Sequence, residues 1–159
     1  MDYRKQLDEA LAIAKDTKSF EFGNDVLGLA PELFRKNFGE KAALVVADNN
    51  TWKAAGEAVT KHIQDAGIEC RTYIFPEEEF HAEFEFVDRV DKILDSYDAI
   101  PVAVGSGVIN DLCKLAAFHH EKPYMVVATA ASVDGYASSG AVVTKDGAKI
   151  NIETHAPKV

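Results

Sequence analysis

The chain has 159 residues, 47% of them hydrophobic, which suits one α/β domain with a packed core. A net charge of −9 argues against a nucleic-acid surface, because phosphate contacts need clustered lysines and arginines. No stretch approaches the roughly 18 apolar residues that cross a bilayer, and the N-terminus reads as an amphipathic helix rather than a signal segment. We therefore expect a cytoplasmic protein with no membrane partner.

Two further features of the composition carry predictions. Nine acids and two bases lie in Glu77–Asp98, and their spacing predicts the solvated face of a helix rather than a calcium loop. Cys70 and Cys113 have no paired spacing, so we expect two buried, inert thiols in a reducing compartment and no catalytic cysteine.

Apolar periodicity predicts the first elements in chain order. We expect a helix over Asp2–Lys15, a short strand at Ser19–Phe22 and another helix from about Asn24. Ala42–Ala47 is a continuous apolar run, typical of a strand buried on both faces. Asp48 and the two asparagines after it predict a turn and a helix N-cap. The helix that follows has an apolar stripe and ends at Gly67.

The same unit then repeats. Strands are expected at Glu69–Phe75, Ala99–Val104 and Tyr124–Ala128, with helices over Phe80–Tyr97 and Asn110–His120 between them. This alternation predicts a parallel sheet with right-handed crossovers. Pro101 must then occupy a strand position that needs no ladder N–H.

The C-terminal part does not continue this alternation of strands and helices. Val142–Thr144 and Lys149–Ile152 flank an Asp-Gly pair, which predicts a β-hairpin. The predicted fold class is α/β, with a Rossmann-like parallel sheet, flanking helices and a C-terminal β-hairpin.

A glycine-rich turn follows the third strand, with the sequence Gly105, Ser106, Gly107, Val108, Ile109, Asn110, Asp111. Glycines allow a tight turn or a close approach to phosphate, and the amides of the next helix attract anions. The dinucleotide fingerprint would place a third glycine where Asn110 stands, so a purely structural turn remains an alternative. Ser106 fits either a helix N-cap or a phosphate ligand, and Lys114 either a phosphate partner or a solvated side chain.

A second loop, Thr129–Gly140, is long for a connection after a strand and carries four Ser/Thr hydroxyls, one carboxylate and two glycines. It suits a polyhydroxy or phosphate ligand, although a capped, flexible surface loop would have the same composition.

These two runs together resemble the sn-glycerol-1-phosphate dehydrogenases, in the wider group of iron-containing alcohol dehydrogenases, glycerol dehydrogenase and 3-dehydroquinate synthase. The runs are Gly105–Lys114 and Thr129–Ser139, and the resemblance extends over nearly the whole chain from about residue 18. It implies that residues 1–159 are a dehydroquinate synthase-like, NAD(P)-binding N-terminal domain and that the helical metal-binding domain is absent from this chain.

The resemblance also implies roles for individual residues. The cofactor, NAD or NADP, would lie along Gly105–Asp111 and be held from the second loop by Thr129, Ser132 and Ser138. Asp134 would bind the polar end of the substrate. Asp48 would meet the adenosine ribose, where a carboxylate favours NAD over the 2′-phosphate of NADP.

The implied reaction is reduction of dihydroxyacetone phosphate, a phosphorylated triose, to sn-glycerol 1-phosphate. In such enzymes a divalent metal (zinc, nickel or iron) held by one Asp and two His polarises the carbonyl. The two His come from the missing half, and Asp134, which could be a lone surviving ligand, is kept on the substrate side.

The five histidines of this chain are expected to bind no metal. His62 and His81 should be exposed and His155 is next to the terminus, while the adjacent His119 and His120 should diverge on a helix. We therefore expect no metal ligands and no catalytic residue in this chain, which alone would not turn over. Two alternatives stay open, a 3-dehydroquinate synthase-like lyase domain and a non-enzymatic nucleotide-binding module; the oligomeric state, with a homo-oligomer as one outcome, is also open.

Overall fold

The computed structural model describes residues 2–159 and has a four-stranded parallel sheet at its centre. Its strands are β1 (Ala42–Asp48), β2 (Cys70–Phe75), β3 (Ala99–Gly105) and β4 (Met125–Ala128), in the spatial order β2-β1-β3-β4. All three strand pairs are parallel. After β1 the chain forms β2 on one side of β1 and then crosses over to form β3 on the other side. The strand order therefore reverses between β1 and β3. This confirms the predicted α/β class.

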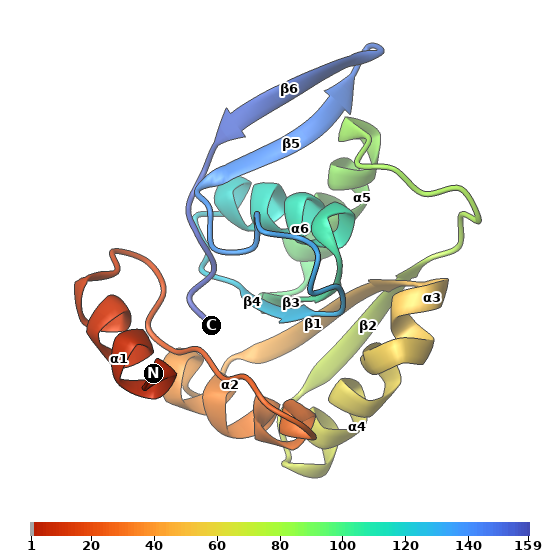
Figure 1. Ribbon diagram of the computed structural model, residues 1–159. Helices are drawn as coiled ribbons and strands as arrows, with labels where there is room; N and C mark the ends of the chain where they lie inside the picture. The colour runs from red at the N-terminus through yellow and green to blue at the C-terminus, as the bar shows by residue number, and fades with distance from the viewer. Residues whose placement is uncertain (1) are drawn as a thin grey trace.

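Helices cover both faces of the sheet (Figure 1). One face carries α5 (Phe84–Ser96) and α6 (Gly107–His119), and the other carries α2 (Ala30–Phe38) and α4 (Glu57–Asp65). Side chains of β1 alternate accordingly, since Leu44 and Val46 join the first core cluster and Val45 joins the second. The sheet is therefore buried on both sides, as the continuous apolar run of β1 predicts.

The helix after β1 begins as the sequence predicts but is not regular. Asp48 caps α3 (Asn49–Thr51), and a π-helical turn, η2 (Trp52–Gly56), then leads into α4. A Cβ on Gly56 would lie 2.8 Å from Cε3 of Trp52, so this glycine makes room for the indole. Gly67, with φ of +75°, follows the end of the helix, as predicted.

Pro101 occupies a permitted place in β3. The Gly105 carbonyl accepts a bond from the Thr129 amide on the β4 side. Because the direction repeats every two residues along a strand, the backbone N–H and C=O positions of residues 103 and 101 also point toward β4. Pairing of β3 with β4 starts only at Val102, opposite Met125. The N–H that proline lacks is therefore not needed.

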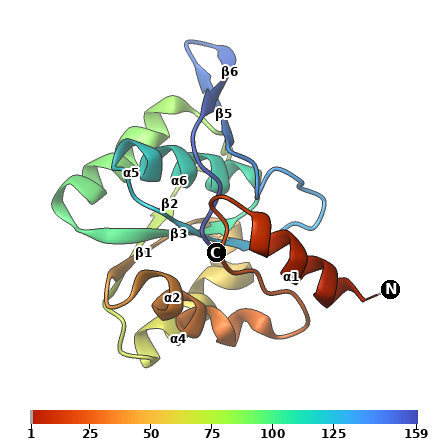
Figure 2. The same ribbon diagram turned by 90° about the vertical axis from the view of Figure 1, so that its left-hand side faces the viewer.

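The hairpin is confirmed. Strands β5 (Gly140–Lys145) and β6 (Ala148–Glu153) pair antiparallel around Asp146 and Gly147, whose φ values are +51° and +77°. Positive φ at both turn residues is the requirement of a type I′ turn. The hairpin stands above α6 in both views, and Ala141 and Val143 bury its inner face in the core of the α5–α6 side (Figure 2).

The N-terminal segment differs from prediction in two places. Helix α1 (Tyr3–Ile13) is present, but Ser19–Phe22 forms no strand. Its backbone runs beside the C-terminus, where only the amides of Lys18 and Ser19 bond, both to the Lys158 carbonyl, too few for a ladder. The helix expected from Asn24 begins instead as a 3₁₀ turn, η1 (Val26–Leu29), before α2.

The two cysteines differ in burial. Cys113 is buried as expected, whereas Cys70 is only partly buried because it lies on the edge strand β2. Burial still raises the pKa of the Cys70 thiol to about 11, which disfavours its reactive thiolate. No helix within residues 2–159 is long and apolar enough to cross a membrane.

Candidate functional site

Three segments meet at the carboxyl edge of the parallel sheet. Asp48 ends β1, the glycine turn follows β3, and the second loop follows β4. The two loops are joined directly, since the Thr129 amide donates to the Gly105 carbonyl at 3.0 Å. The Tyr136 hydroxyl also lies 3.3 Å from that carbonyl and 3.1 Å from the carbonyl of Ala130. The edge where open α/β sheets bind ligands thus carries most of the predicted site residues together.

The two glycines of the turn have different reasons to be glycine. A Cβ on Gly105 would lie 2.7 Å from Cβ of Ile109, so Gly105 is required for the close packing of strand and helix. A Cβ on Gly107 would meet only Cγ1 of Val133, at an ordinary 3.6 Å. The structural-turn explanation therefore accounts for Gly105 and leaves Gly107 without an internal packing reason.

The first turn of α6 is not capped by a side chain. Ser106 occupies the N-cap position with extended backbone (φ −94°, ψ −162°), but its hydroxyl makes no cap hydrogen bond. Asp2 and Asp48 cap α1 and α3 with their carboxylates, whereas α2 and α5, like α6, begin without a side-chain cap. The amides that begin α6 therefore keep their capacity to bind an anion, reinforced by the helix dipole.

Within α6, several predicted site residues turn their side chains into the protein. Ile109 is fully buried, and the buried amide of Asn110 accepts a 2.8 Å bond from the Tyr124 hydroxyl. Only their backbone can reach a ligand at this edge. Asp111 is partly buried, and this burial raises the pKa of its carboxyl, partly offset by Lys114.

Asp48 already has a structural task. Its Oδ1 accepts bonds from the amides of Asn50 and Thr51, both at 2.8 Å, and the Thr51 hydroxyl accepts from the Asp48 amide at 3.0 Å. This capping box confirms the predicted cap.

Lys114 is a site feature whose role the sequence did not reveal. Its side chain is fully buried, so the solvated alternative is wrong. The ammonium donates to the carbonyls of Ser138 at 2.7 Å, Gly140 at 3.1 Å and Gly135 at 3.3 Å. Burial lowers the pKa of Lys114, with the nearby Asp111 opposing that shift. The apolar residues around Lys114 in the sequence do not indicate that this lysine is buried in the protein.

The remaining predicted residues lie on the second loop. Ser132 and Asp134 are exposed, whereas Thr129 is partly buried at the end of β4. Ser138 is exposed, and its hydroxyl donates to the Gly135 carbonyl at 2.9 Å and lies 3.3 Å from the Lys114 ammonium.

A cavity of about 640 Å³ adjoins this loop on the β4 side. It is walled by Thr129, Val133 and Tyr136 on one side and by Phe20, Phe22 and Leu27 on the other, and it does not reach Asp48 or the glycine turn. In the sequence this wall is marked by two phenylalanines just before Gly23. The expected strand at Ser19–Phe22 assigned them to a sheet, whereas the structure leaves both exposed.

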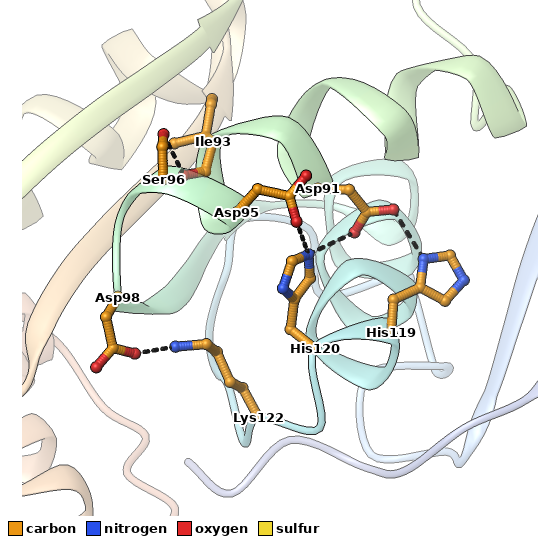
Figure 3. A network of polar contacts seen from close by, with 8 residues as sticks. All are labelled: Asp91, Ile93, Asp95, Ser96, Asp98, His119, His120 and Lys122. Carbon is orange, nitrogen blue, oxygen red and sulfur yellow. Dashed lines mark hydrogen bonds and ion pairs between the residues drawn. The ribbon is translucent and has the colours of Figure 1, made fainter.

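The histidines gather differently from prediction. His62 and His81 are exposed as expected, but His119 and His120 do not diverge (Figure 3). Nδ1 of His119 lies 2.8 Å from Asp91 Oδ2, and Nε2 of His120 lies 3.3 Å from Asp91 Oδ1. His120 follows the last helical residue with non-helical backbone (ψ 8°), which lets both rings turn to α5. This cluster is at the opposite end of α6 from the glycine turn.

Within residues 2–159 no three or more His, Cys, Asp or Glu side chains are grouped so as to hold a metal ion. This part of the chain therefore does not by itself supply the full set of one Asp and two His that the resemblance implies.

Comparison with known proteins decides the family. Residues 21–159 match the iron-containing alcohol dehydrogenase family. The chain belongs to this family. It is 33% identical over 144 residues to an NAD(P)+ glycerol-1-phosphate dehydrogenase of Halalkalibacterium halodurans, covering 86% of this chain and 35% of that protein. Over 116 residues it is 38% identical to the enzyme of the same name from Methanosarcina mazei, covering 72% of this chain and 32% of that protein.

The fold is likewise that of the family. Sulfoacetaldehyde reductase from Bifidobacterium kashiwanohense, solved in complex with NAD+, superimposes with a TM-score of 0.76 at 18% identity, over 91% of this chain and 44% of that one. The chain thus spans about a third of the length of the curated relatives that it matches. The expected resemblance and the dehydroquinate synthase-like N-terminal fold are both confirmed.

Proposed function

We propose that this chain is the NAD(P)-binding part of a glycerol-1-phosphate dehydrogenase, which reduces dihydroxyacetone phosphate to sn-glycerol 1-phosphate. The observation that carries the proposal is the start of α6, where no side chain caps the helix and Gly107 has no packing reason to be glycine. This helix start lies beside β1, where the strand order reverses and dinucleotides bind in folds of this class. The names of the relatives supply the substrate class.

In this proposal the backbone amides at Gly107, Val108 and Ile109 hold the cofactor's pyrophosphate. Asp48 accepts hydrogen bonds from the adenosine ribose through Oδ2, because Oδ1 already receives the two capping bonds. Thr129 and Ser132 approach the cofactor from the second loop, and Asp134 orients the polar end of the triose. The bound NAD(P)H supplies the hydride.

Polarisation of the triose carbonyl is not assigned to any residue of this chain, because residues 2–159 lack a metal-holding group. We propose that the residues for this step belong to the part of the relatives' length that this chain does not span, as a helical metal-binding domain.

The proposal is tested by calorimetric titration of the chain with NADH. Wild type should give saturable heat, and Gly107→Trp should abolish it, because an indole at this position occupies the space through which the pyrophosphate reaches the amides. Phe118→Trp is the matched control, since it places tryptophan at an exposed position near the opposite end of the same helix. Undiminished binding by Gly107→Trp would remove the glycine turn from the site.

A further inference from the structure

Lys114 joins α6 to the second loop by an arrangement that the proposed function does not use. Its ammonium has three N–H donors, and three backbone carbonyls, those of Gly135, Ser138 and Gly140, lie within 2.7–3.3 Å of Nζ. The Ser138 hydroxyl is a fourth neighbour at 3.3 Å. The three carbonyls alone are enough to pair the three donors, which is the condition under which a buried charge is tolerated.

Besides Lys114, Thr154 of the chain after β6 holds the end of the loop, because its amide and hydroxyl donate to the Ser139 carbonyl at 2.7 and 2.6 Å. Ser132, Asp134, Ala137 and Ser138 are exposed, so little apolar burial fixes the segment in place. Its remaining contacts with the glycine turn are the Thr129 amide, the Tyr136 hydroxyl and the approach of Val133 to Gly107. In the C-terminal half of this loop, from Gly135 to Gly140, the backbone carbonyls converge on the Lys114 ammonium.

A buried lysine is a costly solution if the only need is to fill space. An unpaired ammonium in the protein interior would lose several hydrogen bonds to water, and an apolar residue would pack there without that loss. Asp111, one helical turn earlier, supplies the nearby negative charge that favours the ammonium form. The arrangement is explained if the loop must hold one defined conformation at the ligand edge.

We propose that Lys114 is a positioning residue that fixes the second loop against the middle of α6, so that Thr129, Ser132 and Asp134 are held at the nucleotide site. It acts through the loop backbone and touches no ligand itself. The proposal rests on the proposed function for the identity of the ligand, but the anchoring of the loop is measurable without any ligand.

The test compares wild type with Lys114→Met by hydrogen exchange of the whole chain. Loss of the three carbonyl contacts should speed exchange in residues 129–140 by about tenfold, which corresponds to about 1.4 kcal/mol, while exchange in β1 stays unchanged. Affinity for NADH should fall by a similar factor. Lys61→Met is the matched control, because Lys61 is an exposed lysine of α4 paired only with Asp65 across one helical turn, and it should change neither quantity.

A measurement on wild type covers the case in which Lys114→Met does not fold. Acetylation by an amine-reactive reagent should modify Lys61 rapidly and Lys114 last among the lysines. Labelling of Lys114 as fast as Lys61, or unchanged loop exchange in folded Lys114→Met, overturns the anchor. Faster loop exchange with unchanged NADH affinity overturns the positioning role. Wild type that binds no NADH overturns the proposed function, while the exchange comparison still decides whether Lys114 anchors the loop.

Discussion

Asp48 combines two demands at a single residue, a helix cap and a charge at the predicted ribose position. The cap uses Oδ1 alone, since both capping amides bond to that oxygen. An asparagine keeps an oxygen that accepts such bonds and is an equally good N-cap, but it carries no charge. Substitution by asparagine therefore separates the two demands, which alanine would remove together.

We predict that Asp48→Asn raises the affinity for NADPH relative to NADH by about fivefold, because a repulsion of about 1 kcal/mol between carboxylate and 2′-phosphate is removed. Competitive titration of the two nucleotides measures the ratio, and an unchanged melting temperature verifies that the cap survives. Asp88→Asn, at an exposed position of α5, is the charge control. A ratio that stays at the wild-type value would exclude Asp48 from the nucleotide site.

Some features of individual residues could be predicted from the sequence and others could not. The Asp48 cap and the glycine turn were predictable because they depend on neighbours within a few positions. The Lys114 contacts reach residues 21 to 26 positions away, and the histidines reach Asp91 on another helix. No local pattern records such long-range pairs, so the buried lysine and the shared carboxylate could not be predicted.

Among the elements, the β-hairpin was predictable because a two-residue Asp-Gly turn fixes its register. The π-helical turn was not, since it depends on the fit of Trp52 against Gly56. The junction of α5 with β3 shows a further connection between elements. There Asp98 accepts bonds from Lys41 at 3.0 Å, just before β1, and from Lys122, just after α6.

These two lysines lower the pKa of Asp98 from 3.8 to about 2, Lys122 having the larger effect. Because the folded-state pKa is depressed, the unfolded chain binds more protons between pH 2 and 4, so stability rises with pH there. The contribution of Asp98 is fully present above about pH 4 and is lost as pH falls toward 2. It is small, since Asp98 is exposed and solvent screens its charge.

We therefore predict that Asp98→Asn lowers the urea midpoint slightly at neutral pH and that its difference from wild type shrinks as the pH is lowered below 4. Equilibrium urea unfolding at a series of pH values measures this difference. Asp88→Asn should show no such convergence. A deficit for Asp98→Asn that is constant with pH would mean that the lost interaction is not with the charged carboxylate.

At the scale of the whole molecule, the alternation of apolar runs with helical stripes was sufficient to predict a parallel sheet. The spatial order β2-β1-β3-β4 and the placement of helices on two faces follow from packing, which the alternation alone does not specify. The loops at the carboxyl edge come together because parallel strands all end there. The apolar cavity beside β4 arises from the N-terminal segment folding back across the sheet edge, a contact made over more than a hundred residues of sequence.

The whole chain also supports a prediction about competence. Residues 2–159 provide the proposed nucleotide edge but no cluster of metal-ligating side chains. We predict that the isolated 159-residue chain binds NADH yet does not oxidise it in the presence of dihydroxyacetone phosphate, with or without added zinc or nickel. The loss of NADH absorbance measures turnover, and the Methanosarcina mazei relative assayed in parallel is the positive control. Metal-dependent turnover by this chain would show that it polarises the triose carbonyl without the remaining two thirds of its relatives' length, and would contradict the proposed division of binding and chemistry.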